Sequence, residues 1–269
     1  MPKEPGGPIS ETGKLLATDL SVDYPQQLGI LRHARLEVCR GEVVGLVGQS
    51  GSGKTTLAMS VLRLLNHTGA RIEGSVEILG EDVSRWNEPQ MRKIRGRVVS
   101  LIPQSPADAL NPALRLETHL REAWKAHSFR PWIDQKQYVD RLFTEAGLPP
   151  GVAFRHRLPH EISLGQAQRV LIVMALLHAP PLVIADEPTS SLDLITQHEI
   201  LELLRRMKEA YNLGILYISH DLPAVATICD RIAVLEQGTI VESGPTRRLL
   251  EAPQHPYTRR LIEAAPKWR

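Results

Sequence analysis

Residues 48–55 constrain the fold of this chain more than any other part of the sequence. They read GQSGSGKT and fit the pattern G-x-x-x-x-G-K-[ST] at every position. The apolar run VVGLV precedes them, and apolar side chains such as Leu57 and Val61 recur at helical spacing after Thr55. A strand, a glycine-rich turn and a helix in this order are typical of a loop whose backbone N–H groups surround phosphate oxygens.

The residue types in this loop suit the phosphates of a nucleoside triphosphate. Glycines let the backbone turn its N–H groups inward, and the N-terminus of the following helix adds partial positive charge. Lys54 has the length and charge to reach the β- and γ-phosphates, and the Thr55 hydroxyl is suited to bind Mg²⁺. The predicted phosphate-binding residues are Gly48, Ser50, Gly51, Ser52, Gly53, Lys54, Thr55 and Thr56.

A second segment supplies two carboxylates. Residues 182–185 are apolar without alternation, which is typical of a strand buried on both faces, and Asp186 and Glu187 follow them. At the end of such a strand we expect Asp186 beside the phosphate loop, where its carboxylate can hold Mg²⁺. Glu187 is the candidate to orient or deprotonate the attacking water. The two segments together fit many nucleoside triphosphatases.

Composition excludes several other classes of protein. The chain has 32 Lys and Arg against 30 Asp and Glu, a net charge of +2, so we expect no nucleic-acid partner. The two cysteines, Cys39 and Cys229, are too few for a disulfide scaffold. The longest apolar run, residues 170–177, is far shorter than the roughly 20 residues of a membrane-spanning helix. No secretion signal is evident, and we expect a cytoplasmic protein that reaches a membrane only through a partner.

The pattern of strands and helices predicts an α/β fold with a mostly parallel sheet. Residues 105–160 contain half of the aromatic residues and lack strand-like alternation, which indicates a helical insert with its own core. Strands are expected at 15–22, 31–38, 42–47, 74–78, 98–102, 182–185, 214–218, 232–235 and 239–241, and helices after Thr55, at 166–178 and at 196–209. The expected parts are a flexible leader (1–13), a nucleotide-binding core (14–104 and 166–244), a helical subdomain (105–165) and a C-terminal extension (245–269).

The segment HEISLGQAQR, residues 160–169, discriminates among the many proteins that share the first two motifs. It lies shortly before Asp186 and resembles L-S-G-G-Q-x-Q-R, the signature of the ATP-binding subunits of ABC transporters. The chain resembles this family over nearly its whole length. The resemblance implies a P-loop ATPase core with an N-terminal antiparallel β part and a helical subdomain, and ATP and Mg²⁺ as substrate and cofactor.

The same resemblance implies how the signature works. Two subunits enclose two ATP molecules, and the signature of one contacts the γ-phosphate held by the other. Ser163 and Gly165 would contact that phosphate, together with Gln166, where we expect a helix to begin and to contribute its dipole.

Further residues match family elements in the expected order. Gln104 matches the Q-loop glutamine, which senses the γ-phosphate through metal or water, and His220 matches the switch histidine that contacts it. Residues 191–193 match the D-loop at the dimer interface. Tyr24 stands where the family has an aromatic ring that stacks on adenine. The resemblance implies catalytic roles for Glu187, His220 and Gln104 and metal binding by Thr55, Gln104 and Asp186.

Leu164 departs from the family pattern, which usually has Gly at this position. Its side chain is expected at the dimer face, near the γ-phosphate of the opposite subunit. Either the local φ is positive, which Leu tolerates poorly, or φ is negative and Leu is accommodated. Two assemblies are compatible with Leu164. The chain pairs with a different ATPase that has a regular signature, or it forms a homodimer with two impaired sites.

Two further segments resemble importers of oligopeptides, dipeptides and nickel. One is the sequence QSP with ALNP within residues 104–112, and the other is HPYT at residues 255–258. The resemblance implies an ATPase that powers a bacterial importer for peptides or for nickel or metal-chelate ligands. Its partners would be membrane permease subunits, a second ATPase subunit and, indirectly, a solute-binding protein. It would lie peripherally on the cytoplasmic face of the bacterial inner membrane.

Two other functions fit part of the sequence. A soluble ABC ATPase of a carbon–phosphorus lyase-type complex shares the HPYT-like tail. An ABC ATPase that acts on nucleic acid usually carries tandem cassettes or long coiled-coil or zinc inserts. This sequence of 269 residues shows a single cassette without them, which argues against that class. No cysteine follows Cys229, so we do not expect the iron–sulfur cluster found in longer peptide-importer ATPases.

Overall fold

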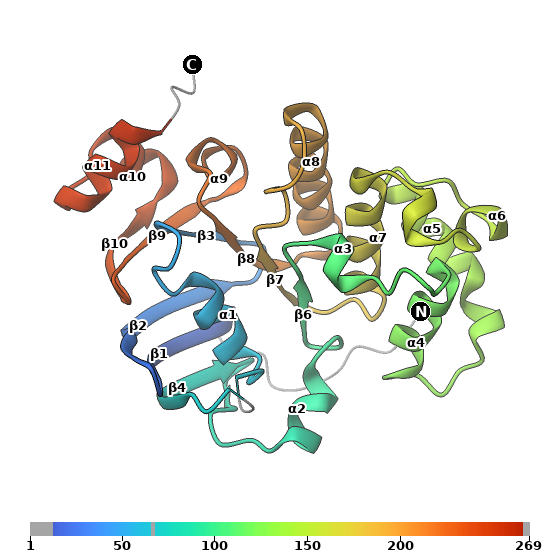
Figure 1. Cartoon of the computed structure of the whole chain (residues 1–269), viewed down its shortest axis with the longest axis horizontal. Coiled ribbons are helices and arrows are strands. Elements are labelled where there is room, and N and C mark those ends of the chain that lie inside the picture. Colours follow the sequence, from blue (N-terminus) through green and yellow to red (C-terminus); the bar gives the residue numbers. More distant parts are fainter. Residues whose placement is uncertain (1–12, 66–67, 266–269) are drawn as a thin grey trace.

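Two β-sheets and a group of helices make up the part of the chain that the computed structural model describes, residues 13–65 and 68–265. The sheets lie at the left and centre of Figure 1, the helices from the middle of the sequence on the right, and the last two helices at the upper left. Within these residues no helix is both long and apolar enough to cross a membrane. The predicted leader, 1–13, lies outside the described residues except for Gly13.

The first sheet is antiparallel, with the order β2-β1-β4-β5. Its strands are β1 (Lys14–Tyr24), β2 (Gln27–Cys39), β4 (Arg71–Ile78) and β5 (Glu81–Asp82). From Leu16 to Val22, β1 alternates between buried and half-buried residues, as expected when one sheet face covers a core. The β1–β2 hairpin turns after Tyr24, which pairs with Gln27. The residue predicted to stack on adenine therefore lies at the end of a hairpin.

The second sheet has the order β10-β9-β3-β8-β7-β6. All neighbouring strands are parallel except β10, which runs antiparallel to β9. The mostly parallel sheet predicted from the sequence is thus confirmed. Its strands are β3 (Val43–Val47), β6 (Val99–Ile102), β7 (Leu182–Asp186), β8 (Gly214–Ser219), β9 (Arg231–Glu236) and β10 (Thr239–Pro245).

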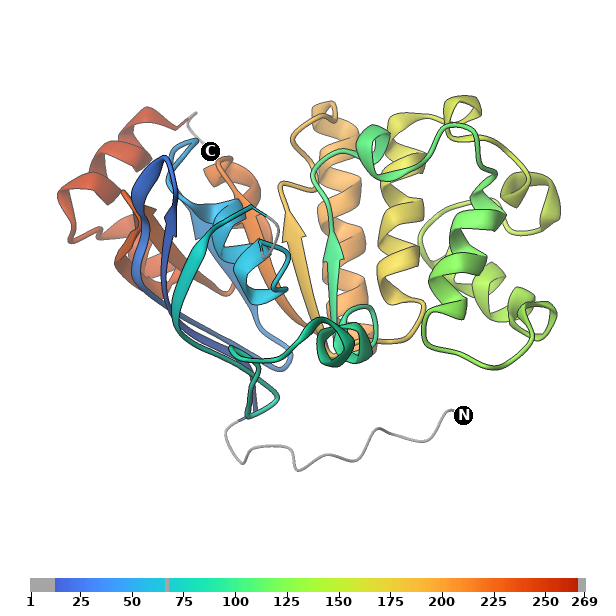
Figure 2. The same cartoon turned by 60° about the horizontal axis from the view of Figure 1, so that its bottom comes forward.

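Two hydrophobic cores cover the two faces of this parallel sheet. In β3, Val44 and Leu46 pack in the core shared with the first sheet and α1 (Lys54–Val61). Val43 and Val47 pack in the other core, together with α7 (Leu164–Leu176), α8 (Leu194–Tyr211) and α9 (Leu222–Ile228). Figure 2 shows α7 and α8 side by side next to the strands. Because both faces are buried, β3, β7 and β8 contain no exposed residue and show no alternation.

The parallel register brings three strand ends to one edge of the sheet. Val47 at the end of β3 pairs with Ser219 at the end of β8, and Asp186 at the end of β7 pairs with Ile218. The segments that follow these strands are the phosphate loop, Glu187 and His220. Residues far apart in the sequence therefore meet at this edge.

The insert between β6 and α7 is helical, as predicted. The separate core expected for it is wrong: Phe143 and Phe154, whose rings meet edge to face with centroids 5.8 Å apart, belong to the core that also contains Val43 and Val47 of β3. The boundaries proposed for the core, the helical subdomain and the extension remain predictions. The insert contains α3 (Pro106–Ala109), α4 (Leu116–Lys125), η1 (Trp132–Gln135), α5 (Lys136–Glu145), α6 (Val152–Arg155) and η2 (Pro159–Glu161), while α2 (Glu88–Ile94) precedes β6.

Helix α7 begins at Leu164, and the start predicted at Gln166 is wrong. Ser163 is the N-cap: its hydroxyl accepts a hydrogen bond from the Gln166 N–H at 3.2 Å, and the Gln166 side chain accepts one from the Ser163 N–H at 3.1 Å. This reciprocal capping box fixes the helix start two residues earlier. Helix α8 also begins earlier than predicted, because Asp193 caps it.

Two short helices end the described chain beside the β9–β10 hairpin. They are α10 (Thr246–Glu251) and α11 (Pro256–Ala264). Figure 1 shows them on the opposite side of the molecule from the helical insert. The HPYT sequence forms the beginning of α11, with His255 as its N-cap.

Candidate nucleotide-binding site

A cavity of about 380 Å³ lies beside the phosphate loop. Most of the residues predicted to bind nucleotide line it, although they come from β1, the phosphate loop, α1 and the segments after β6 and β7. Gln27 and Ile30 of β2 also line it and were not predicted; only their proximity to Tyr24 in the sequence pointed to them. The lining residues are Tyr24, Gln27, Ile30, Ser50, Gly51, Gly53, Lys54, Thr55, Thr56, Gln104 and Glu187.

Two glycines of the phosphate loop, Gly48 and Gly53, stand where a side chain would collide with backbone. A Cβ at Gly48 would lie 2.3 Å from the carbonyl oxygen of Leu235. Gly53 has a φ of +107°, and a Cβ there would lie 2.8 Å from the carbonyl oxygen of Ile30. Ser52 is buried, and its hydroxyl has no hydrogen-bond partner among the described residues. The tight loop therefore keeps its backbone close to the neighbouring strands.

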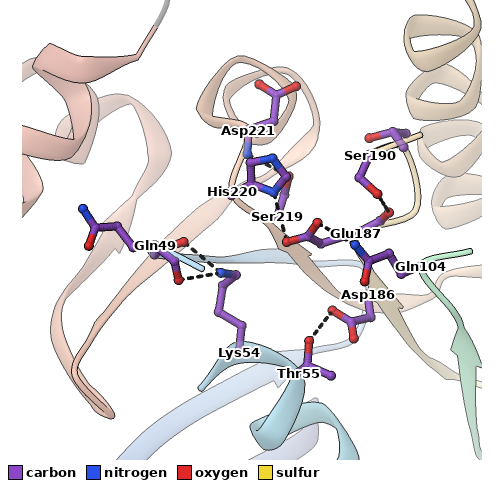
Figure 3. Close-up of polar contacts among 12 residues, drawn as sticks. Gln49, Lys54, Thr55, Gln104, Asp186, Glu187, Ser190, Ser219, His220 and Asp221 are labelled. Carbon is purple, nitrogen blue, oxygen red and sulfur yellow. Dashed lines mark hydrogen bonds and ion pairs between the residues drawn. The ribbon is translucent and has the colours of Figure 1, made fainter. Parts of the chain in front are cut away.

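Lys54 is held inside the loop by backbone carbonyls. Its ammonium donates hydrogen bonds to the carbonyl oxygens of Gly48 at 2.8 Å and Gln49 at 3.0 Å (Figure 3). Burial lowers the pKa of Lys54, while the carboxylates of Glu187 and Asp186 oppose that shift. Phosphate oxygens carry full negative charge and are stronger acceptors than neutral carbonyls, so this ammonium is suited to exchange one set of partners for the other.

Thr55 and Asp186 face each other across the site. The Thr55 hydroxyl donates to a carboxylate oxygen of Asp186 at 3.3 Å (Figure 3). Burial raises the pKa of Asp186, and the hydrogen bond from Thr55 and the charge of Lys54 counteract it. In residues 13–65 and 68–265, no group of three or more His, Cys, Asp or Glu side chains is arranged so that it could hold a metal ion by itself. An oxygen pair with few protein ligands fits Mg²⁺, which takes its other ligands from phosphates and water.

Three of the predicted residues, Gln104, Glu187 and His220, form one hydrogen-bonded group (Figure 3). The Glu187 carboxylate accepts from the side-chain amide of Gln104 at 3.1 Å and from Nδ1 of His220 at 3.0 Å. Because a carboxylate oxygen only accepts, His220 carries a proton on Nδ1 in this pair. These two hydrogen bonds thus hold the carboxylate of Glu187, which lines the same cavity as Lys54.

Glu187 has a backbone conformation that is uncommon for its residue type. Its φ is +46°, in the left-handed region. Its N–H donates to the Ile218 carbonyl at 2.9 Å, and Ser190 donates its hydroxyl proton to the Glu187 carbonyl at 3.1 Å. Strain of this kind costs about 1–3 kcal/mol and persists where surrounding contacts enforce it. Ser190 and its contact were not predicted from the sequence.

The signature residues do not line the cavity of their own chain. Ser163 and Leu164 are exposed at the beginning of α7, and Gly165 and Gln166 form its first turn. A Cβ at Gly165 would lie 2.6 Å from a methyl carbon of Thr196, so this glycine allows α7 to approach α8 closely. Leu164 is helical and has no positive φ, so of the two backbone alternatives the accommodated one is correct.

Comparison with known proteins identifies the family. Residues 31–190 match the family described as ABC transporter. The chain belongs to the ABC transporter family. Residues 241–269 match the family described as oligopeptide/dipeptide transporter, C-terminal region, so the HPYT segment lies within a second matched region of this ABC protein.

Relatives and solved structures of ABC proteins agree with this assignment. The chain is 39% identical over 239 residues to the probable D,D-dipeptide transport ATP-binding protein DdpD of Escherichia coli K12, covering 88% of this chain and 73% of DdpD. It is 35% identical to the glutathione import ATP-binding protein GsiA of Salmonella paratyphi A, covering 90% of this chain but only 40% of GsiA. A solved ATP-binding subunit of an ABC transporter has 31% identity and a TM-score of 0.70, with 88% of this chain and 92% of that one covered.

Replacing Lys54 with Ala tests the phosphate loop of this ABC protein. The variant loses the ammonium that would donate charge-assisted hydrogen bonds to the phosphates. The Kd for ATP should therefore rise by about 10- to 100-fold. Calorimetric titration with ATP and Mg²⁺ measures this change. Lys93→Ala, at an exposed lysine of α2, is the matched control and should bind ATP like the wild type. Unchanged affinity in Lys54→Ala would contradict the assignment of the loop.

Proposed function

We propose that this chain is the ATP-hydrolysing subunit of an ABC importer for peptides. One observation carries the hydrolysis: Lys54 lines the cavity at the phosphate loop together with Glu187, whose carboxylate is held by two neighbouring side chains. DdpD and GsiA, the relatives described above, are named for dipeptide transport and glutathione import, which supports peptides as the cargo class over nickel or metal chelates.

The proposed hydrolysis assigns one task to each side chain. Lys54 binds the β- and γ-phosphates, and Tyr24, which lines the cavity, stacks on the base. Glu187 orients the attacking water and accepts its proton, while Gln104 and His220 hold the Glu187 carboxylate in place. Thr55 and Asp186, with Gln104, would hold Mg²⁺, which neutralises phosphate charge when bound.

A second ATPase subunit is part of the proposal, because the signature cannot act on the cavity of its own chain. Apolar side chains are exposed at the beginnings of α7 and α8: Leu164 at 40%, Leu194 at 83% and Ile195 at 75%. Exposed apolar groups next to Ser163 favour a protein partner on this face. The second subunit is a copy of this chain or a different ATPase.

The remaining partners follow from the proposed transport role. Membrane permease subunits would bind the groove formed by the helical insert and the segment after Gln104, and a solute-binding protein would act through the permeases. The chain would then lie on the cytoplasmic face of the bacterial inner membrane. Co-purification with membrane subunits supports this role, whereas co-purification with soluble lyase subunits would support the carbon–phosphorus lyase alternative.

Glu187→Gln tests hydrolysis separately from binding. The amide retains the shape of the side chain but loses the basic carboxylate, so turnover should fall by about 100-fold or more while ATP still binds. The variant should also accumulate a nucleotide-bound dimer, which size-exclusion chromatography with ATP detects.

The matched control is Glu251→Gln, which changes a largely exposed glutamate of α10 that pairs with Arg247. Its turnover and dimer content should equal those of the wild type. Turnover near the wild-type rate in Glu187→Gln would show that another residue activates the water.

Leu164 allows a test of the composite site in the assembled complex. Because its backbone is helical, any impairment comes from the side chain, and Leu164→Ala should relieve it as well as Leu164→Gly does. We expect both to raise steady-state ATPase activity by roughly fivefold, or about 1 kcal/mol of relieved crowding. Lower activity in both variants would mean that Leu164 makes a productive contact.

A further inference from the structure

The C-terminal extension reaches the phosphate loop through one side chain, Tyr257. The backbone N–H of Gln49, the second residue of the loop, donates a hydrogen bond to the Tyr257 hydroxyl at 3.0 Å. These residues are 208 positions apart in the sequence. Tyr257 belongs to the HPYT segment, and its side chain is not among those assigned to nucleotide binding above.

Tyr257 is held firmly by its surroundings. The Glu242 carboxylate on β10 accepts hydrogen bonds from the backbone N–H groups of Gln254 at 2.8 Å and His255 at 2.9 Å, which fixes the entry to α11. The Tyr257 side chain is buried, with 5% of its surface exposed, and the Arg260 guanidinium lies 5.9 Å from its ring centre. The hydroxyl is therefore placed by the β9–β10 hairpin rather than by a free helix.

Gln49 connects this hydroxyl to the Lys54 ammonium. Its carbonyl oxygen accepts hydrogen bonds from Lys54 Nζ at 3.0 Å and from the Ser52 N–H at 3.1 Å. If Lys54 exchanges either carbonyl for a phosphate oxygen of ATP, its hold on this part of the loop weakens. The bond from Gln49 to Tyr257 does not involve Lys54, so it remains to hold this part of the loop in place.

We propose that Tyr257 is a positioning residue for the phosphate loop: its hydroxyl fixes the Gln49 amide, and through it the C-terminal extension sets the affinity of the loop for ATP. This inference rests on the proposed function, because it requires ATP to bind at this loop. It assigns a physical task to the HPYT segment that concerns nucleotide binding rather than cargo.

Tyr257→Phe tests the proposal with the smallest possible change. The ring and its packing remain, and only the acceptor for the Gln49 N–H is lost. We expect the Kd for ATP to rise roughly three- to tenfold, the change expected from one hydrogen bond, and KM to rise with it while kcat changes less than about twofold. Calorimetry with ATP and Mg²⁺ gives Kd, and steady-state kinetics separate KM from kcat.

Tyr211→Phe is the matched control, since it removes a hydroxyl that donates to Glu145 at 2.6 Å and does not line the cavity. It should leave Kd unchanged, although its Tm in the absence of nucleotide should change about as much as that of Tyr257→Phe. An equal effect of the two variants on Kd would overturn the proposal, because the loss would then be one of general stability.

A double substitution locates the effect at Gln49. Proline lacks a backbone N–H, so Gln49→Pro removes the same hydrogen bond from the donor side. In the Gln49→Pro background, Tyr257→Phe should cause no further change in Kd. A full additional effect would show that the hydroxyl acts elsewhere and would overturn the proposal.

The wild-type titration distinguishes the two levels of failure. If the wild-type chain binds no ATP, the proposed function fails. If the wild type binds ATP and Tyr257→Phe binds it equally well, the proposed function stands and the role of Tyr257 is wrong.

Discussion

Parallel pairing of β3, β8 and β7 is the constraint on which the rest of the structure depends. It places the ends of the three strands at one edge, so that the phosphate loop, Glu187 and His220 meet without any direct link in the sequence. A parallel sheet needs cover on both faces, and the two hydrophobic cores provide it. The rigidity of this scaffold allows Glu187 to keep a strained backbone conformation at the site.

Charge compensation determines how the site is organised before nucleotide binds. Lys54 is surrounded by two carbonyl oxygens and lies close enough to Asp186 and Glu187 for their charges to offset part of its burial. Asp186 is 3% exposed and is itself stabilised by Thr55 and Lys54. Each group thus has a partner that phosphate or Mg²⁺ can replace, so binding exchanges existing contacts instead of creating charge in an apolar cavity.

The meeting of Lys54, Thr55, Asp186 and Glu187 at one place could be predicted from the sequence, because these residues belong to short motifs with fixed local geometry. The mostly parallel sheet could be predicted as well, because strands buried on both faces lack alternation. The start of α7 could not, since the signature pattern points to Ser163 and Gln166 as phosphate contacts and gives no sign that they also form a capping box. The Gln49–Tyr257 contact depends on how the last helices pack against β9 and β10, which no local pattern specifies.

The most direct test of the central claim is a calorimetric titration of the full wild-type chain with ATP in the presence of Mg²⁺. The cavity of about 380 Å³ at the phosphate loop is assigned as the nucleotide site, so one ATP should bind per chain. Affinity should fall when Mg²⁺ is removed with EDTA, because Thr55 and Asp186 then lose the ion between them and the phosphates. Absence of ATP binding with Mg²⁺ present, or equal affinity with and without the metal, would contradict the account.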